Sequence, residues 1–127
     1  GLEKNIISNA IKSFEIKGSS RKDIIVAIGP SISGDNYLLD KQTFYNFFST
    51  NNGYLSKVNA NINKLKDTES IPLDIKKYAY LQLLMDDIDP NNIDISNKCT
   101  YALPNEFHSW RRSNTDRRQW SVICTSS

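Results

Sequence analysis

Residues 23–29, DIIVAIG, form a continuous apolar and mostly β-branched run that decides how the rest of the chain can fold. A run of this length is typical of a β-strand, and its apolar character on both faces predicts a central strand covered by helices on each side. We therefore expect Asp23–Gly29 to lie in the core of an α/β domain.

The segments on either side of this strand carry helix signals. Before it, apolar residues at three- and four-residue steps predict an amphipathic helix over residues 2–16, and Gly18 is placed to let the chain leave that helix. Later in the chain, the same periodicity predicts a helix over residues 72–86, with Pro72 in its first turn. Both helices have an apolar face that needs a partner surface.

The remaining segments complete an alternation of helices and strands. Residues 29–40, GPSISGDNYLLD, pack turn-forming residues directly after the strand, which suits either a ligand-binding loop or a plain connection. Asp40 can cap a short helix, and residues 49–70 are polar enough for a surface excursion. Residues 92–96, NIDIS, alternate as a half-buried strand does. The predicted fold class is α/β, with a layered mixed sheet flanked by helices.

Length and composition restrict the classes of protein to which the chain can belong. Its 127 residues suit one domain, and 39% apolar with 24% charged residues is an ordinary composition for a soluble protein. No apolar run is long enough to span a membrane and the first residues do not resemble a signal peptide, so we expect a cytoplasmic protein. Cys99 and Cys124 are too few for a disulfide scaffold and lack metal-ligand spacing.

Arginine is concentrated near the end of the chain. Residues 107–120, FHSWRRSNTDRRQW, hold four of the five arginines, both tryptophans and the only histidine, whereas lysine is preferred elsewhere. The pattern predicts two strands, 107–112 and 118–125, joined by a polar turn over 113–116. The inner face of this hairpin would carry Phe107, Trp120 and Val122, or the residues next to them.

Three interpretations of the arginine cluster remain open. Side chains alternate along a strand, so one arginine of each adjacent pair would point toward a common site, and the rest would be solvated or paired with Glu106 and Asp116. The planar guanidinium can instead bind phosphate or carboxylate through two hydrogen bonds. Arginines and tryptophans could also bind nucleic acid, but a net charge of +2 makes that interpretation weak.

Several motifs together resemble one known family. Residues 26–40 carry VAIGPSIS and NYLLD, residues 73–113 read LDIKKYAYLQLLMDDIDPNNIDISNKCTYALPNEFHSWRRS, and residues 115–123 read TDRRQWSVI. In this order they resemble the C-terminal half of the laccase-domain family, also described as polyphenol oxidases or purine nucleoside phosphorylases. The resemblance covers most of the chain and implies that residues 1–127 are part of a single α/β domain.

The resemblance also implies an activity and a cofactor. Proteins of the family that this chain resembles hold a zinc ion with two histidines and a cysteine. They act on purine nucleosides or, in some bacteria, on misassembled peptidoglycan precursors. The last ligand lies in a His-Ala-Gly-Trp-Arg-Gly stretch, whose final glycine corresponds to Gly1. We therefore expect zinc in the complete protein, with all its ligands upstream of Gly1, and no activity from this chain alone.

Substrate-contacting residues can be carried over to matching positions. The resemblance implies an anion-contacting pair at Arg111 and Arg112, hydrogen-bond donors at Thr100 and Ser109, and a loop rim formed by Gly29–Ile32, which includes Ser31. The expected ligands are a purine nucleoside and phosphate, or another small anion. We expect no membrane partner and do not favour nucleic acid as a partner. Exposed strand edges would allow the chain to associate with other chains.

Some positions depart from the family pattern. His108 stands where the family usually has phenylalanine, and a lone histidine on a strand is more often a satisfied core or surface residue than a metal ligand. Ser33 and Gly34 alter the usual glycine turn. These changes affect substrate choice more than they affect the fold.

Overall fold

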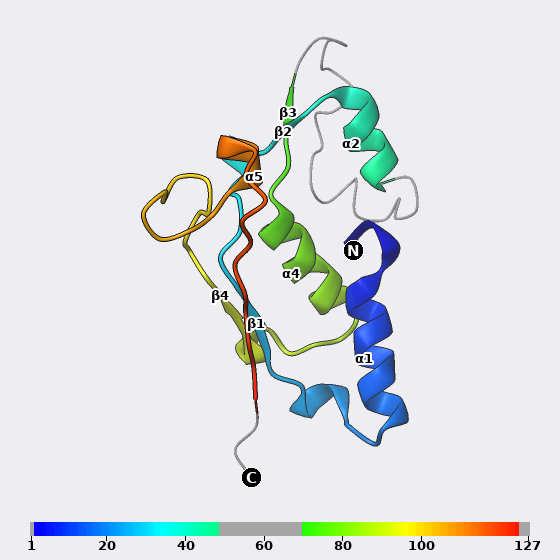
Figure 1. The fold of residues 1–127 in the computed structure, drawn as a ribbon. Coiled ribbons are helices and arrows are strands. Elements are labelled where there is room, and N and C mark those ends of the chain that lie inside the picture. The colour runs from blue at the N-terminus through cyan, green and yellow to red at the C-terminus, as the bar shows by residue number, and fades with distance from the viewer. Residues whose placement is uncertain (1, 49–69, 125–127) are drawn as a thin grey trace.

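The computed structural model describes residues 2–48 and 70–124 (Figure 1). Its helices are α1 (Ile6–Ile16), α2 (Lys41–Phe48), α4 (Ile75–Met85) and the short α5 (Trp110–Ser113), and its strands are β1 (Val26–Ile28), β2 (Leu38–Leu39), β3 (Ile71–Pro72) and β4 (Ile93–Ile95). Among the described residues, a 3-10 turn at Leu2–Lys4 precedes α1, and further 3-10 turns at Arg21–Asp23, Gly34–Asn36 and Pro90–Asn92 lie between the later elements. The surface excursion expected over 49–70 lies outside the described residues, except for Ser70.

The strand predicted at 23–29 exists but is shorter and less buried than expected. β1 spans only Val26–Ile28 and pairs in parallel with β4, with Val26 opposite Ile93 and Ile28 opposite Ile95. None of the residues 23–29 is buried, and the Ile25 side chain is 80% exposed. The prediction of a core strand covered on both faces was therefore wrong, because helices cover one face only among the residues that the structure describes.

The helix predicted at 2–16 begins as a 3-10 turn and becomes regular at Ile6. Asn5, between the two parts, has a left-handed backbone with φ of 54°. At the other end Gly18, with φ of 94°, donates its N–H to the Glu15 carbonyl, and the next N–H reaches the Phe14 carbonyl. This is the Schellman arrangement that glycine favours, so the predicted role of Gly18 is confirmed.

The helix predicted at 72–86 begins three residues later than expected. Asp74 is its N-cap and accepts hydrogen bonds from the backbone N–H groups of Lys76 and Lys77. Pro72 lies outside the helix, in β3, which pairs antiparallel with β2. A proline fits there because β3 is a two-residue strand with few ladder hydrogen bonds to make.

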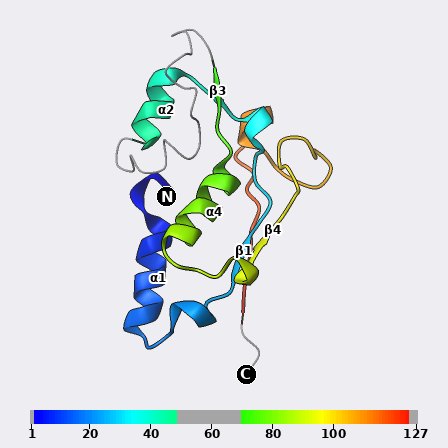
Figure 2. The same cartoon turned by 180° about the vertical axis from the view of Figure 1, so that it is seen from behind.

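The core consists of two clusters of apolar side chains that share helix α4. The first joins α2 to α4 and contains Leu39, Phe44, Phe48, Ile71, Leu73 and Tyr78. The second joins α1, α4 and the β1 strand and centres on Ile11, Leu83 and Ile88. Both views place α4 between α1 and the β1–β4 pair (Figures 1 and 2).

The hairpin predicted at 107–125 is absent from the described residues 107–124. Instead, the Ser113 N–H donates to the Ser109 carbonyl and the Asn114 N–H to the Trp110 carbonyl, which makes α5 a single helical turn. The Trp120 and Val122 side chains, expected on an inner face, are 90% and 87% exposed. Strand alternation needs a cross-strand partner, and residues 118–124 have none among the described residues.

The α/β class predicted from the sequence is confirmed, with helices beside one parallel and one antiparallel strand pair. The two pairs do not join into one sheet within the described residues. Among the described helices, none has the length and apolar character that crossing a membrane requires.

Candidate functional site

A pocket of about 360 Å³ lies beside the start of α5. Its polar lining comes from Thr100, His108, Ser109 and Arg111, and its other walls come from Ile32, Tyr37, Ile75 and Trp110. Three of the residues predicted to contact substrate, Thr100, Ser109 and Arg111, thus line one cavity. They arrive there from two segments, the turn after β4 and the entry to α5.

Thr100 and Ser109, the two residues of the pocket lining that carry hydroxyl groups, are buried residues. Thr100 and Ser109 are each 7% exposed, and neither hydroxyl makes a hydrogen bond within residues 2–48 and 70–124. Neither oxygen is among the fully buried side-chain atoms that lack a partner, so each hydroxyl is accessible at the pocket wall. Two such groups on a pocket wall are available to a ligand.

The Arg111 guanidinium lies over the Tyr37 ring, 5.0 Å from the ring centroid. Arg111 is exposed, and no carboxylate of the described residues forms an ion pair with it. The aromatic face holds the cation at the pocket without neutralising it, so its five N–H donors remain free for an anion.

Arg112 has a different environment from its neighbour. Its Nη1 atom donates to the carbonyls of Thr100 at 2.8 Å and Tyr101 at 2.7 Å, and its Nη2 atom donates to the Phe107 carbonyl at 2.7 Å. With these donors engaged, Arg112 connects the segment that carries Thr100 to the segment that leads into α5. The predicted anion-contacting pair therefore separates into a residue that lines the pocket and one that holds its walls.

Arg117 and Arg118 do not line this pocket. Arg118 is exposed, and its Nη1 atom donates to the Thr115 and Arg117 carbonyls, both at 3.0 Å. Of the four arginines that stand together in the sequence, Arg111 is therefore the one that lines this pocket.

Most of the predicted loop rim lies beside the pocket rather than in its lining. The Ser31 carbonyl accepts a hydrogen bond from the Thr100 N–H at 3.1 Å, within an isolated parallel bridge between Ser31 and Cys99. Gly29 is exposed, and a Cβ atom at its position would meet nothing within 4 Å. Ile32, the last residue of the rim, does line the pocket.

Sequence reasoning missed the arrangement around Cys99. Its sulfur accepts hydrogen bonds from the Ser33 N–H at 3.3 Å and the Ser33 hydroxyl at 3.2 Å, and the Asn36 amide lies 3.7 Å away. Burial opposes ionisation of the thiol, but the Ser33 donors and backbone N–H groups outweigh it and lower the Cys99 pKa from 9.0 to about 7. The departure from the family's glycine turn at Ser33 was the one feature of the sequence that could have pointed to this arrangement.

Sequence reasoning also missed His108, Tyr37 and Ile75 as pocket residues. His108 was expected to be a core or surface residue rather than a metal ligand; it is exposed, and it lines the cavity that holds Arg111. Tyr37 and Ile75 come from residues whose patterns indicated a connection and a packing helix. Only the three-dimensional approach of the 29–40 loop, α4 and α5 reveals them.

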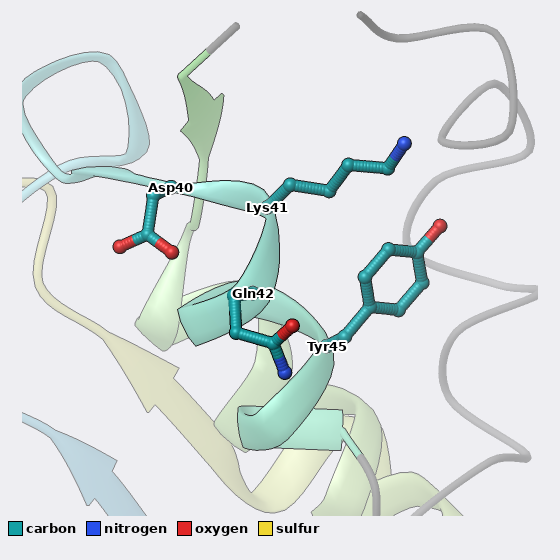
Figure 3. A pocket seen from close by; sticks show the side chains of 4 residues that line it. All are labelled: Asp40, Lys41, Gln42 and Tyr45. Carbon is teal, nitrogen blue, oxygen red and sulfur yellow. The ribbon is translucent and has the colours of Figure 1, made fainter. Parts of the chain in front are cut away.

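Two other cavities have linings of different character. One, of about 360 Å³, lies at the start of α2, where Figure 3 shows Lys41 and Tyr45 extending to one side and Asp40 to the other. Asp40 accepts from the Thr43 N–H and hydroxyl, which lowers its pKa and caps α2 as predicted. The other, of about 390 Å³, is an apolar groove between α1 and β1 that includes Phe14 and Ile25.

Metal-binding side chains do not converge in the part of the chain described here. Across residues 2–48 and 70–124, no group of three or more histidine, cysteine, aspartate or glutamate residues could hold an ion. Cys99 and His108 lie on neighbouring segments but lack a third ligand. These residues therefore do not form a zinc site by themselves.

A family model, one relative and one solved structure are similar to this chain. The family model described as multi-copper polyphenol oxidoreductase laccase matches residues 1–126. Purine nucleoside phosphorylase slr1573 of Synechocystis sp. is 28% identical over 142 residues, covering 97% of this chain and 52% of that protein. The crystal structure of the Bacillus licheniformis hypothetical protein YfiH has a similar fold, with a TM-score of 0.68 at 21% identity over 90% of this chain and 42% of that one. This chain spans about half the length of both.

Proposed function

We propose that this chain, which belongs to the multi-copper polyphenol oxidoreductase laccase family, supplies the anion-binding part of a purine nucleoside phosphorylase active site. The observation that carries the proposal is the pocket in which Arg111, without a carboxylate partner among the described residues, lies beside the free hydroxyls of Thr100 and Ser109. The name of the Synechocystis relative supports phosphorolysis as the reaction.

In this proposal the pocket binds inorganic phosphate. The planar guanidinium of Arg111 would donate two parallel hydrogen bonds to two phosphate oxygens, and the hydroxyls of Thr100 and Ser109 would donate to the others. Leaving the Tyr37 ring costs Arg111 about 0.5–1 kcal/mol at an exposed site, which is less than a charge-assisted hydrogen bond returns.

Phosphorolysis then needs the phosphate to be held in line with the sugar. A phosphate oxygen bonds to C1′ of the ribose as the bond from C1′ to the purine nitrogen breaks, and the purine takes the electron pair and a proton. Arg111 would hold the phosphate so that one of its oxygens points at C1′, which fixes the direction of attack. The chain contributes this positioning, and the nucleoside would contact Tyr37 and Trp110 on the pocket walls.

The cofactor and the alternatives remain separate proposals. The family resemblance implies zinc in the complete protein, but the described residues do not fit a zinc site, and we derive no step through a metal. Adenosine deamination and hydrolysis of a peptidoglycan precursor are alternative reactions of the same site, and all of these reactions suit a cytoplasmic enzyme. A non-enzymatic module that binds nucleic acid is the alternative of a different class.

Calorimetric titration of the protein with inorganic phosphate tests the anion site. We expect saturable binding that Arg111→Lys weakens about tenfold, because lysine cannot reproduce the two parallel hydrogen bonds. Arg117→Lys is the matched control, since Arg117 is exposed on the same segment and does not line the pocket. Equal losses in the two variants would contradict a specific site.

A second titration separates the enzyme proposal from the nucleic-acid alternative. A nucleic-acid module would bind oligonucleotides with an affinity that falls steeply as salt rises, because each neutralised phosphate releases counterions. We expect no measurable oligonucleotide binding at moderate salt. Tight, salt-dependent binding would instead favour the non-enzymatic module.

A further inference from the structure

We infer that His108 is a second, pH-dependent cation of the anion pocket, so that the pocket prefers a dianion once this imidazole is protonated. The inference rests on the proposed function, because it assigns a partner to Arg111 in the same cavity. It also gives a role to the residue that departs from the usual family pattern.

The placement of His108 supports this role. It lines the pocket with Arg111, three residues earlier in the chain and on the other side of Ser109. Its backbone N–H donates to the Gln119 Oε1 atom at 3.1 Å, which fixes the residue at the pocket mouth. The imidazole itself makes no hydrogen bond or ion pair with the described residues, so both ring nitrogens are available to a ligand.

In the part of the chain that the structure describes, the pocket lining holds no acidic residue that could pair with the imidazole. Among the residues that line the pocket, Arg111 is the one permanent cation, Tyr37 is the other titratable group, and none is acidic. The nearest acidic residue in the sequence, Glu106, forms an ion pair with Lys98. No carboxylate of the lining therefore competes with a bound anion for the imidazolium.

The chemistry of the two side chains is complementary. Arg111 offers a fixed pair of donors and keeps its positive charge at all relevant pH values. A histidine side chain, in contrast, changes its charge within the physiological pH range. With both charged, a tetrahedral dianion would meet two cations and the hydroxyls of Thr100 and Ser109. With His108 neutral, one full charge remains, which suits a monoanion.

Sulfate is the probe that tests the inference, because it stays a dianion across the pH range in which histidine titrates. We expect its affinity for the protein to rise about tenfold between roughly pH 8 and pH 5.5, because a histidine side chain gains its positive charge as the pH falls through this range. In His108→Gln, which keeps a polar side chain without the titration, the affinity should stay nearly constant over that range.

Cys99 needs its own control because its thiol pKa of about 7 falls in the same pH range. Its deprotonation would place a negative charge one residue from Thr100 and weaken anion binding as pH rises. If the pH dependence disappears in Cys99→Ser and persists in His108→Gln, the inference is overturned in favour of the thiol. The opposite result supports His108.

A nuclear magnetic resonance titration gives a readout that does not depend on a substituted protein. His108 is the only histidine of the chain, so its ring protons can be assigned without ambiguity. An anion that binds the imidazolium must raise the His108 pKa by linkage, and we expect a rise on saturation with sulfate. An unchanged His108 pKa with sulfate bound through Arg111 would refute this inference alone. Sulfate binding that Arg111→Lys leaves unchanged would refute the proposed function as well.

Discussion

The Arg112 guanidinium donates a hydrogen bond of 2.8 Å to the carbonyl oxygen of Thr100, twelve residues earlier in the chain. Through this contact, and those to Tyr101 and Phe107, one arginine sets the separation between the two segments that form the pocket. Arg111, its neighbour, is left to face the cavity. The division of roles follows from their positions on one helical turn.

Arg112→Lys should therefore act on stability rather than directly on anion binding. Lysine has three donors on one atom and cannot reach three carbonyls in the same directions, so we expect a loss of about 2 kcal/mol in the free energy of unfolding. Chemical denaturation followed by circular dichroism measures this loss. Arg118→Lys, whose guanidinium bonds only to exposed carbonyls, should change the unfolding midpoint little. The same small change in both variants would show that Arg112 does not hold the pocket walls.

Cys99 should react with thiol reagents at lower pH than an ordinary cysteine. Because its pKa is lowered to about 7, half of the Cys99 thiol is ionised near neutral pH, and the thiolate is the reactive form. In a Cys124→Ser background, the alkylation rate by iodoacetamide should reach half its maximum near that pH. In Ser33→Ala the midpoint should move upward, because the hydroxyl donor to the sulfur is lost. A midpoint unaffected by Ser33→Ala would contradict the role of that hydroxyl.

Gly18→Ala should destabilise the end of α1. The φ of 94° at this position is unfavourable for any residue with a Cβ atom, and the expected cost is roughly 1 kcal/mol. Gly29→Ala is the matched control, because space is open around Gly29 and its φ is not positive. Thermal unfolding of the two variants should show a lower midpoint for Gly18→Ala only. A midpoint equally lowered in Gly29→Ala would contradict a cost specific to the left-handed backbone at Gly18.

The apolar groove between α1 and β1 should make the isolated chain associate at high concentration. Ile25, which lines the groove, is 80% exposed, and β1 pairs with β4 along only one edge among the described residues. Exposed apolar surface beside a free strand edge favours association. Ile25→Lys should reduce the weight-average mass in sedimentation equilibrium. Ile16→Lys, at an equally exposed position outside the groove, should not. A concentration-independent monomer would contradict this expectation.

Local signals in the sequence identified the elements whose stability is local. The caps at Asp40 and Gly18 and the periodicity of α4 predicted helices that the structure confirms, because these signals act within one or two turns. The start of α4 was misplaced because Pro72 suits both a first helical turn and a short strand. The choice is made by pairing with Leu38, which lies far away in the sequence.

The candidate site was partly predictable, for a different reason. The family motifs identified Thr100, Ser109 and Arg111, which the structure brings to one pocket. Strand alternation predicted that one arginine of the adjacent pair would face the site, and the pocket does include Arg111 and not Arg112, although the segment is helical. His108 and Tyr37 could not be predicted, because their proximity depends on how the 29–40 loop folds against α5 rather than on any pattern in either segment.

Helix α4 contributes Tyr78 to one core cluster and Leu83 to the other, so neither cluster can open without disturbing the same helix. A molecule with two separate apolar clusters would ordinarily lose them in two steps. Here the shared helix should couple them into one cooperative unit, and its backbone amides should be the last to exchange with deuterated solvent. The residues that wall the anion pocket, attached to α4 through Ile75 and through the Lys76 ammonium that binds the Ser96 and Lys98 carbonyls, would then keep their shape until the whole chain unfolds.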